Sequence, residues 1–221
     1  MINTEKILSR TDHTCLKPDA ALKDIEKLCA EAIEYKTASV CVPPSFVRQA
    51  KEFVNNNTKV CTVIGFPNGY STIDTKQFEI GRAVDDGADE IDVVLNIGFV
   101  KDREWDKILD EINYMRHYLT DTVVKIIIET CLLTDAEKIK LCEIISESNA
   151  DYIKTSTGFG SSGAKIEDIL LFKKHLDPRV KIKASGGINS LEFAEQLLEA
   201  GADRLGSSRL VELAVQYRAN K

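Results

Sequence analysis

One stretch of the sequence reads Asp151-Tyr152-Ile153-Lys154-Thr155-Ser156-Thr157-Gly158-Phe159-Gly160, which has the composition of a short strand that ends in a loop of small residues. A second stretch, Lys181-Ile182-Lys183-Ala184-Ser185-Gly186-Gly187, again places a lysine shortly before glycines. A buried lysine is costly to keep charged. Two such lysines side by side therefore suggest an amine that is kept partly neutral, as imine chemistry requires.

Strand-like and helix-like segments alternate along almost the whole chain. The expected strands cover Arg10–Thr14, Ala38–Val42, Lys59–Ile64, Glu90–Leu95, Val123–Glu129, Tyr152–Thr155, Lys181–Ala184 and Arg204–Gly206. Expected helices include Asp19–Tyr35, Thr134–Ser148, Ser190–Ala200 and Ser207–Ala219. Each unit averages roughly 28 residues, which suits the repeat of a barrel. We therefore predict an α/β fold, a (β/α)8 TIM barrel with a short N-terminal helix.

A weak internal repeat supports this prediction. The triplets Gly87-Ala88-Asp89, Asn149-Ala150-Asp151 and Gly201-Ala202-Asp203 each join an expected helix to a strand, and Gly or Asn tolerates the left-handed backbone that ends many helices. An open doubly wound sheet is the alternative, but it usually has fewer strands. Because no G-x-G-x-x-G follows the first strand and no Pro/Ser-rich linker divides the chain, we expect a closed barrel and one domain over residues 1–221.

Composition excludes several classes of partner. The net charge is −6 and no long basic run is present, so nucleic acid is not the expected partner. No apolar run approaches the roughly 18–20 residues of a membrane span, and the N-terminus is too polar for a signal peptide. None of the six cysteines shows zinc-ligand spacing, and His117 is expected at the surface. A cytoplasmic protein with free thiols is the simplest interpretation.

Functional groups of such barrels gather at the C-terminal ends of the strands. The candidates there are Asp12, His13, Cys41, Asp92, Glu129, Lys154 and Lys183. Because side chains alternate along a strand, an inward Lys154 faces an inward Lys183 on the next strand, about 4.8 Å away. Asp92 lies on a strand of the same parity and is expected in the same layer. Lys125 and Lys181, at the starts of their strands, are expected to close the bottom of the barrel.

Some of these residues also have a structural interpretation. Lys154 by itself would suit a structural ion pair, but its partners at matching positions favour a catalytic site. Cys41 suits a core position better than a nucleophile. Asp12 either caps or pairs with a lysine, and Glu129 is a possible partner for Lys154 or Lys183.

Glycines form a second feature. Gly158, Gly186-Gly187 and Gly206-Ser207-Ser208 follow three consecutive strands. Glycine lets backbone N–H groups approach an anion, and barrel phosphate sites often use the loops after the seventh and eighth strands. Together these residues predict a phosphate site.

The sequence resembles the deoxyribose-phosphate aldolase family of class I aldolases over essentially its whole length. The resemblance rests on Thr11-Asp12-His13-Thr14-Cys15-Leu16-Lys17-Pro18, Ser39-Val40-Cys41-Val42, Asp89-Glu90-Ile91-Asp92-Val93-Val94, Lys125-Ile126-Ile127-Ile128-Glu129-Thr130, Tyr152-Ile153-Lys154-Thr155-Ser156-Thr157-Gly158 and Lys183-Ala184-Ser185-Gly186-Gly187-Ile188. It implies reversible cleavage of 2-deoxy-D-ribose 5-phosphate to D-glyceraldehyde 3-phosphate and acetaldehyde, with no metal or organic cofactor. It also implies a homo-oligomer, most simply a dimer.

The resemblance assigns a function to each matching residue. Lys154 would form the Schiff base, Lys183 would tune its ionisation by like-charge repulsion and relay protons, and Asp92 would transfer protons through water. The residues implied to bind substrate are Asp12, Cys41, Thr157, Gly158, Gly186, Gly187, Gly206, Ser207 and Ser208. Phe159 stands where some members carry a lysine, so phosphate binding depends more on backbone N–H groups. We expect Arg209, in the first turn of the last helix, to pair with the phosphate.

Three other functions remain as alternatives. Another Schiff-base barrel aldolase, such as a transaldolase-like or keto-acid enzyme, would use the same paired lysines. A cofactor-free sugar-phosphate isomerase or epimerase needs acid–base groups but no imine, so the lysine pair argues against it. A phosphosugar-binding scaffold without catalysis would have no need for Asp92, Lys154 and Lys183 together.

Overall fold

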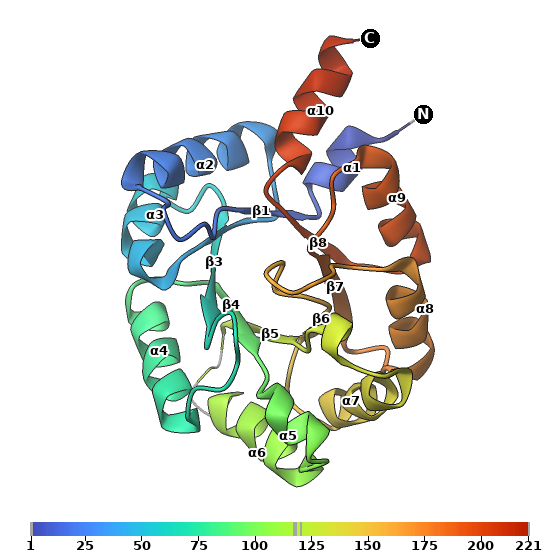
Figure 1. Cartoon of the computed structure of the whole chain (residues 1–221). Coiled ribbons are helices and arrows are strands. Elements are labelled where there is room, and N and C mark those ends of the chain that lie inside the picture. Colours follow the sequence, from blue (N-terminus) through green and yellow to red (C-terminus); the bar gives the residue numbers. More distant parts are fainter. Residues whose placement is uncertain (1, 117–118, 120, 221) are drawn as a thin grey trace.

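Parallel strands close into a barrel in this computed structural model, which describes residues 2–116, 119 and 121–220 (Figure 1). Strand order around the barrel follows the chain, and β8 pairs with β1. The strands of the described chain are β1 (Thr11–Thr14), β2 (Ser39–Val42), β3 (Lys59–Ile64), β4 (Glu90–Val94), β5 (Val123–Ile127), β6 (Tyr152–Lys154), β7 (Lys181–Ser185) and β8 (Arg204–Ser207). The predicted (β/α)8 barrel is confirmed.

Helices surround the strands, and the two chain ends lie on the same side of the barrel, beside α1 and α10 (Figure 1). The α-helices are α1 (Thr4–Leu8), α2 (Leu22–Tyr35), α3 (Val47–Val54), α4 (Ile73–Asp85), α5 (Ile97–Lys101), α6 (Trp105–Arg116), α7 (Asp135–Glu147), α8 (Ile166–His175), α9 (Leu191–Ala200) and α10 (Leu210–Ala219). Short 3-10 turns are η1 (Pro44–Phe46) and η2 (Thr130–Leu132). Among the described helices, none is long and apolar enough to cross a membrane. His117 lies outside the described residues.

Two helices, α2 and α10, begin three residues later than predicted, for local reasons. The Asp24 carboxylate accepts the Ala21 N–H at 2.9 Å, so α2 starts at Leu22 rather than at Asp19. Ser207 belongs to β8, and its hydroxyl accepts the N–H of Arg209 at 3.1 Å, so α10 starts only at Leu210. In both places a polar side chain satisfies a backbone donor just before the first helical turn.

The apolar core lies between the strands and the helices, not inside the barrel. On β4, Ile91 and Val93 are fully buried in this outer core, while Asp92 between them points to the barrel axis. The same alternation places Ile153 and Ile182 outward and Lys154 and Lys183 inward, as predicted. The interior is therefore free to hold charged side chains, because the surrounding apolar layer supplies the folding energy.

The aspartates of the internal repeat perform one task three times. Each carboxylate stands at the start of an even-numbered strand and accepts a backbone N–H from the preceding strand: Asp89 from Val60 (2.9 Å), Asp151 from Val124 (2.8 Å) and Asp203 from Ile182 (3.0 Å). These bonds fasten neighbouring strands together at their N-terminal ends. The repeat is a structural device of the barrel, remote from the strand ends where chemistry is expected.

The first residues of the triplets differ from one another. Gly87 and Gly201 have left-handed backbones, with φ of +100° and +118°, as predicted. The same prediction for Asn149 is wrong, because its φ is not positive. The preceding Ser148 performs the cap instead: its hydroxyl donates to Ile145 O at 2.8 Å and accepts the Ala150 N–H at 3.2 Å.

We expect Asp89→Ala to lower the free energy of unfolding by about 1–3 kcal/mol, because a buried backbone N–H loses its acceptor. Burial opposes ionisation, but Val60 N–H and Lys51 together lower the pKa of Asp89. The ionic part of this stabilisation is therefore present above about pH 4 and is lost as the pH falls through the lowered pKa. Urea unfolding measured against pH tests this, with the exposed Asp110→Ala as the control. Equal losses of unfolding free energy in Asp89→Ala and Asp110→Ala would contradict this role of Asp89.

Candidate active site

The three residues predicted to meet inside the barrel do meet. Lys154 and Lys183 are register partners on β6 and β7. Both ammonium groups reach the same carboxylate oxygen, since Asp92 Oδ2 lies 2.8 Å from Lys154 Nζ and 2.6 Å from Lys183 Nζ. All three side chains are buried, with 0–4% of each exposed.

Six side chains form a closed ring of alternating charge around the barrel axis, which we call the charge ring. In order, its members are Lys125, Asp92, Lys183, Asp12, Arg204 and Glu90. The distances are 2.8 Å for Lys125–Asp92, 2.6 Å for Asp92–Lys183, 2.5 Å for Asp12–Arg204, 3.2 Å for Arg204–Glu90 and 2.7 Å for Glu90–Lys125, while Lys183 and Asp12 are in direct contact. Three carboxylates thus neutralise three cations.

Contacts within the charge ring favour the ionised forms of Asp92 and Lys183. Burial alone would raise the pKa of Asp92, but Lys125, Lys154 and Lys183 lower it well below its usual range. Burial alone would lower the pKa of Lys183, but Asp12 and Asp92 raise it. The folded carboxylate therefore stays charged above about pH 4, and the ammonium stays charged past about pH 10.

Lys154 is a seventh charged group that is attached to the charge ring only through Asp92. It has no carboxylate of its own, because Asp92 Oδ2 is shared with Lys183 and Asp92 Oδ1 is occupied by Lys125. If Lys154 loses its proton, the cluster becomes neutral and every ring member keeps its partners. Loss of a proton from any other lysine would leave a buried carboxylate without a full complement of cations, which is costly.

A cavity of about 850 Å³ opens above Lys154. Its lining includes Lys154 but no member of the charge ring. Seven of the residues predicted to bind substrate also line it: Thr157, Gly158, Gly186, Gly187, Gly206, Ser207 and Ser208. Lys154 is therefore the one amine of this cluster that a molecule in the cavity can reach.

Two predicted substrate contacts, Asp12 and Cys41, do not line this cavity. Asp12 is fully buried beneath it and is bound by Lys183, Arg204 and the Ser39 hydroxyl, which donates at 2.7 Å. Cys41 is buried in a small apolar cluster of the interior. Both residues are therefore internal supports in this conformation rather than cavity walls.

The loops after β6 and β7 form the glycine-rich side of the cavity. Gly158, Gly186 and Gly187 have φ of +87°, +82° and +70°, which glycine adopts without the strain of a side chain. The two loops touch through bare backbone, since a Cβ on Gly163 would lie 2.2 Å from Gly186 O. Small residues are therefore needed here for close approach, and they leave backbone groups facing the cavity.

Arg209 supplies a cation at the same side. It lines the cavity together with Ser207 and Ser208, as expected for a residue that meets an anion. Its position differs slightly from the prediction: it is the residue before α10 rather than part of the first turn.

Glu129 and Lys125 differ in position from the predictions. Glu129, a possible partner for Lys154 or Lys183 by sequence, instead accepts the Thr157 hydroxyl and the Thr157 N–H, the latter at 3.3 Å. A left-handed backbone at Glu129, with φ of +49°, turns the chain away after β5. Lys125 was expected to close the barrel bottom beside Lys181, yet it is fully buried and bonded to Asp92, whereas Lys181 is exposed.

Glu90 and Arg204 belong to the charge ring but were not among the residues predicted from the sequence. Alternation carried a signal for Glu90, because a residue two positions before an inward Asp92 also points inward. Alternation carried the same signal for Arg204, because its neighbour Leu205 faces the outer core. Its partners Asp12 and Glu90 lie on β1 and β4, so the pairing itself could not be read from the sequence.

Cysteines come close to the carboxylates of the ring. Cys41, Cys61 and Asp92 place their ligand atoms within 4.8 Å of one another, as do Asp12, Cys61 and Glu90. Lys125 Nζ lies 3.4 Å from Cys61 Sγ and 2.8 Å from Asp92 Oδ1 and already neutralises this position. A metal ion there would have to displace the ammonium, so these groups suit a metal poorly.

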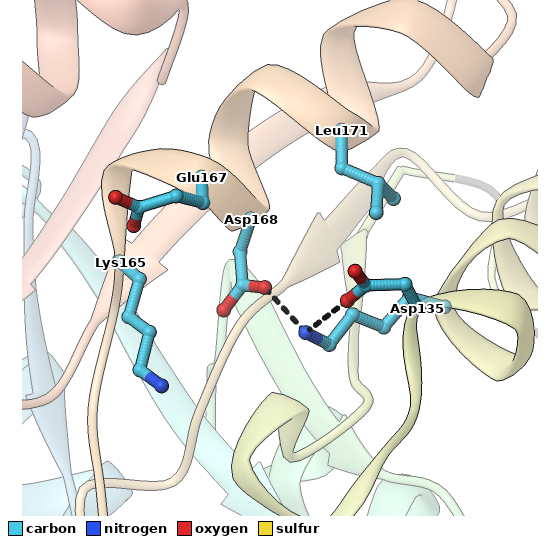
Figure 2. A pocket seen from close by; sticks show the side chains of 6 residues that line it. Asp135, Lys165, Glu167, Asp168 and Leu171 are labelled. Atoms are coloured by element: carbon cyan, nitrogen blue, oxygen red, sulfur yellow. Dashed lines mark hydrogen bonds and ion pairs between the residues drawn. The ribbon is translucent and has the colours of Figure 1, made fainter.

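A second hollow, of about 440 Å³, lies on the helix layer between α7 and α8 (Figure 2). Two of its carboxylates already have a partner, because Lys138 donates to Asp168 at 2.7 Å and to Asp135 at 3.1 Å (Figure 2). These contacts fasten two neighbouring helices. This hollow is consequently a structural salt-bridge site.

Comparison with known proteins agrees with this geometry. A model described as DeoC/LacD family aldolase matches residues 7–209. The chain belongs to the DeoC/LacD family of aldolases. It is 49% identical over 212 residues to a protein from Clostridium botulinum (strain Alaska E43 / Type E3) named deoxyribose-phosphate aldolase, with 96% of each chain covered.

Solved structures of aldolases have the same fold. One, described as "QR15, an Aldolase", gives a TM-score of 0.92 at 38% identity and covers 97% of this chain and 96% of its own. Another is a tetrameric deoxyribose phosphate aldolase from Aeropyrum pernix, with a TM-score of 0.88 at 28% identity, covering 99% of this chain and 94% of its own. Similarity therefore spans the whole barrel of this DeoC/LacD-family aldolase.

We expect Gly163→Ala to destabilise this DeoC/LacD-family aldolase by about 1–3 kcal/mol, because the new methyl group collides with the Gly186 carbonyl. The displaced loop is also expected to weaken the binding of inorganic phosphate, measured by calorimetry. Gly81→Ala on α4 is the matched control, since its Cβ meets nothing within 4 Å and the helix gains about 0.5–1 kcal/mol. Unchanged stability and phosphate binding in Gly163→Ala would show that the loop contact does not matter.

Proposed function

We propose that this protein is a class I aldolase that reversibly cleaves 2-deoxy-D-ribose 5-phosphate to D-glyceraldehyde 3-phosphate and acetaldehyde, using Lys154 as its imine-forming amine. Membership of the aldolase family supports the reaction class. The observation that carries the assignment of the amine is the pendant position of Lys154 above the neutral charge ring, in the wall of the cavity. The reaction requires no metal or organic cofactor.

Lys154 starts the reaction as a nucleophile. Its unprotonated amine attacks the aldehyde carbon of the open-chain sugar, and loss of water from the adduct gives a protonated imine. The imine draws electrons from the C2–C3 bond while the C3 hydroxyl loses its proton, so the bond breaks and glyceraldehyde 3-phosphate departs. The remaining enamine is protonated at carbon, and hydrolysis releases acetaldehyde and the free amine.

Asp92 and Lys183 control the protonation of the Lys154 amine and of the adduct formed on it. Asp92 Oδ2, at 2.8 Å, is the carboxylate oxygen next to Lys154 Nζ and is placed to exchange protons with the adduct through water. Lys183, at 2.6 Å from the same oxygen, remains a cation and makes a second positive charge beside it unfavourable. Lys183 thus opposes a positive charge on Lys154, whereas Asp92 offers the oxygen through which protons are exchanged.

The glycine-rich side of the cavity is proposed to hold the substrate phosphate. Gly186, Gly187, Ser207 and Ser208 combine loop backbone and hydroxyl groups from the ends of β7 and β8. Arg209 adds a cation next to this set. Phe159 also lines the cavity and stacks edge-on against Phe66 with ring centroids 5.3 Å apart, so it supplies an apolar wall rather than a charge.

We further propose a homo-oligomer, most simply a dimer, in the cytosol. A relative of the same fold is a tetramer, which supports assembly but not a particular number of subunits. All six cysteines are free thiols, although Cys41 and Cys61 are register partners on neighbouring strands, and this suits a reducing compartment. The partners are small phosphosugars and aldehydes.

Borohydride reduction in the presence of acetaldehyde tests the imine. We expect a stable mass increase on one tryptic peptide, assigned by fragmentation to Lys154, because reduction traps the carbon–nitrogen bond. Lys154→Leu is expected to form no adduct at this site and to lose at least about 10³-fold in kcat, since the covalent path is removed. Labelling of Lys183 instead of Lys154, or of neither, refutes the assignment.

The variant Arg209→Ala tests whether Arg209 binds the phosphate group of the substrate. We expect KM for 2-deoxyribose 5-phosphate to rise roughly tenfold or more, because a charge-assisted hydrogen bond contributes about 1.5–3 kcal/mol. Kinetics with unphosphorylated 2-deoxyribose are expected to stay unchanged, which separates phosphate recognition from general damage. Arg82→Ala on α4 removes an equal charge at the outer surface and serves as the control. An unchanged KM for the phosphorylated substrate would exclude Arg209 from the site.

A further inference from the structure

We propose that Lys125 is a positioning residue for imine formation: it holds Asp92 through Oδ1 and, together with Glu90, keeps the charge ring neutral, so that the Lys154 amine can react uncharged. This inference rests on the proposed function of Lys154. Lys125 lies outside the cavity lining and acts only through its neighbours.

The two carboxylate oxygens of Asp92 have different partners. Lys125 Nζ occupies Oδ1 at 2.8 Å, together with the Cys61 thiol at 3.3 Å, whereas Lys154 and Lys183 share Oδ2. The carboxylate plane is consequently fixed from the side opposite the reacting amine. Without Lys125, Oδ1 would lose its cation, and Asp92 would be free to turn toward Lys154 with both oxygens.

Lys125 and Glu90 set the net charge that surrounds Lys154. With all members ionised, the charge ring has three positive and three negative groups, so a neutral Lys154 leaves the interior neutral. Removing the Lys125 charge makes the ring negative and favours a proton on Lys154. Removing the Glu90 charge makes the ring positive and disfavours that proton.

Every strand around the amine except β6, which carries Lys154, contributes a titratable or charged group to this balance. These groups are Asp12, Cys41, Cys61, Glu90, Asp92, Lys125, Lys183 and Arg204. Glu129 at the end of β5 is engaged by Thr157. Because the variants change only Lys125 and Glu90, the contributions of the other groups cancel when the variants are compared.

The two residues form a matched pair for a charge-compensation experiment. Lys125 and Glu90 touch each other at 2.7 Å, and neither lines the cavity. Lys125→Met and Glu90→Gln therefore perturb the ring in opposite directions without removing a group that touches substrate. The double variant restores neutrality, and Lys125→Arg keeps the positive charge.

The measurement is the rate of borohydride-trapped adduct on Lys154 against pH, with acetaldehyde as the probe. We expect the midpoint of this profile to move up by about 1–2 pH units in Lys125→Met and down by a similar amount in Glu90→Gln. The double variant is expected to return to within about 0.5 units of the wild type, and Lys125→Arg to stay there. A purely structural effect would lower rates at every pH and would not reverse sign.

Thermal unfolding of each variant accompanies the profiles. If Lys125→Met does not fold, the downward shift in Glu90→Gln and its cancellation by Lys125→Met in the double variant decide the question. Unmoved midpoints in folded variants, with normal trapping in the wild type, overturn the positioning proposal and leave the proposed function intact. Absence of a Lys154 adduct in the wild type overturns both.

Discussion

The neutral charge ring inside the barrel is the interaction on which the rest of this structure depends. Burying one of these ions alone would be prohibitive, and removing one partner of a buried pair typically costs about 3–5 kcal/mol. The cost is met only because each carboxylate touches at least two cations and the ring closes on itself. A closed barrel is suited to this arrangement, because it brings six side chains from five strands to one axis.

The outer layers make this interior possible. Apolar residues on the other face of every strand, such as Ile91, Ile153 and Ile182, pack against the helices and supply the hydrophobic stabilisation that the interior lacks. The aspartates of the internal repeat fasten neighbouring strands at their N-terminal ends. A register slip of one residue would turn an isoleucine inward and a lysine into the apolar core, so register and chemistry are maintained together.

The proposed function depends on an asymmetry between the two ends of the barrel. Toward the N-terminal ends of the strands, the ring is complete and sealed, as shown by the full burial of Lys125 and Asp12. At the C-terminal ends, Lys154 is one cation in excess and faces a cavity walled by the glycine loops. Lys154 thus differs from the two other lysines at the axis both in its excess charge and in its access to the cavity.

Much of this was readable from the sequence. Alternation along Glu90–Val94, Tyr152–Lys154 and Lys181–Ser185 predicted that Asp92, Lys154 and Lys183 meet, because apolar neighbours can face only the helix layer. Family motifs identified the loops that line the cavity. These features are local, since each depends on residues within one strand or one turn.

The partners of the ring were decided only by the tertiary structure. Arg204 contacts Asp12 on the neighbouring β1 and Glu90 on β4 across the barrel, and Lys125 holds Asp92 rather than closing the bottom. Glu129 turns away from the lysines because its left-handed backbone aims it at Thr157. A sequence states which side chains point inward, but strand register and closure of the barrel determine which charges touch and which of the buried lysines lines the cavity.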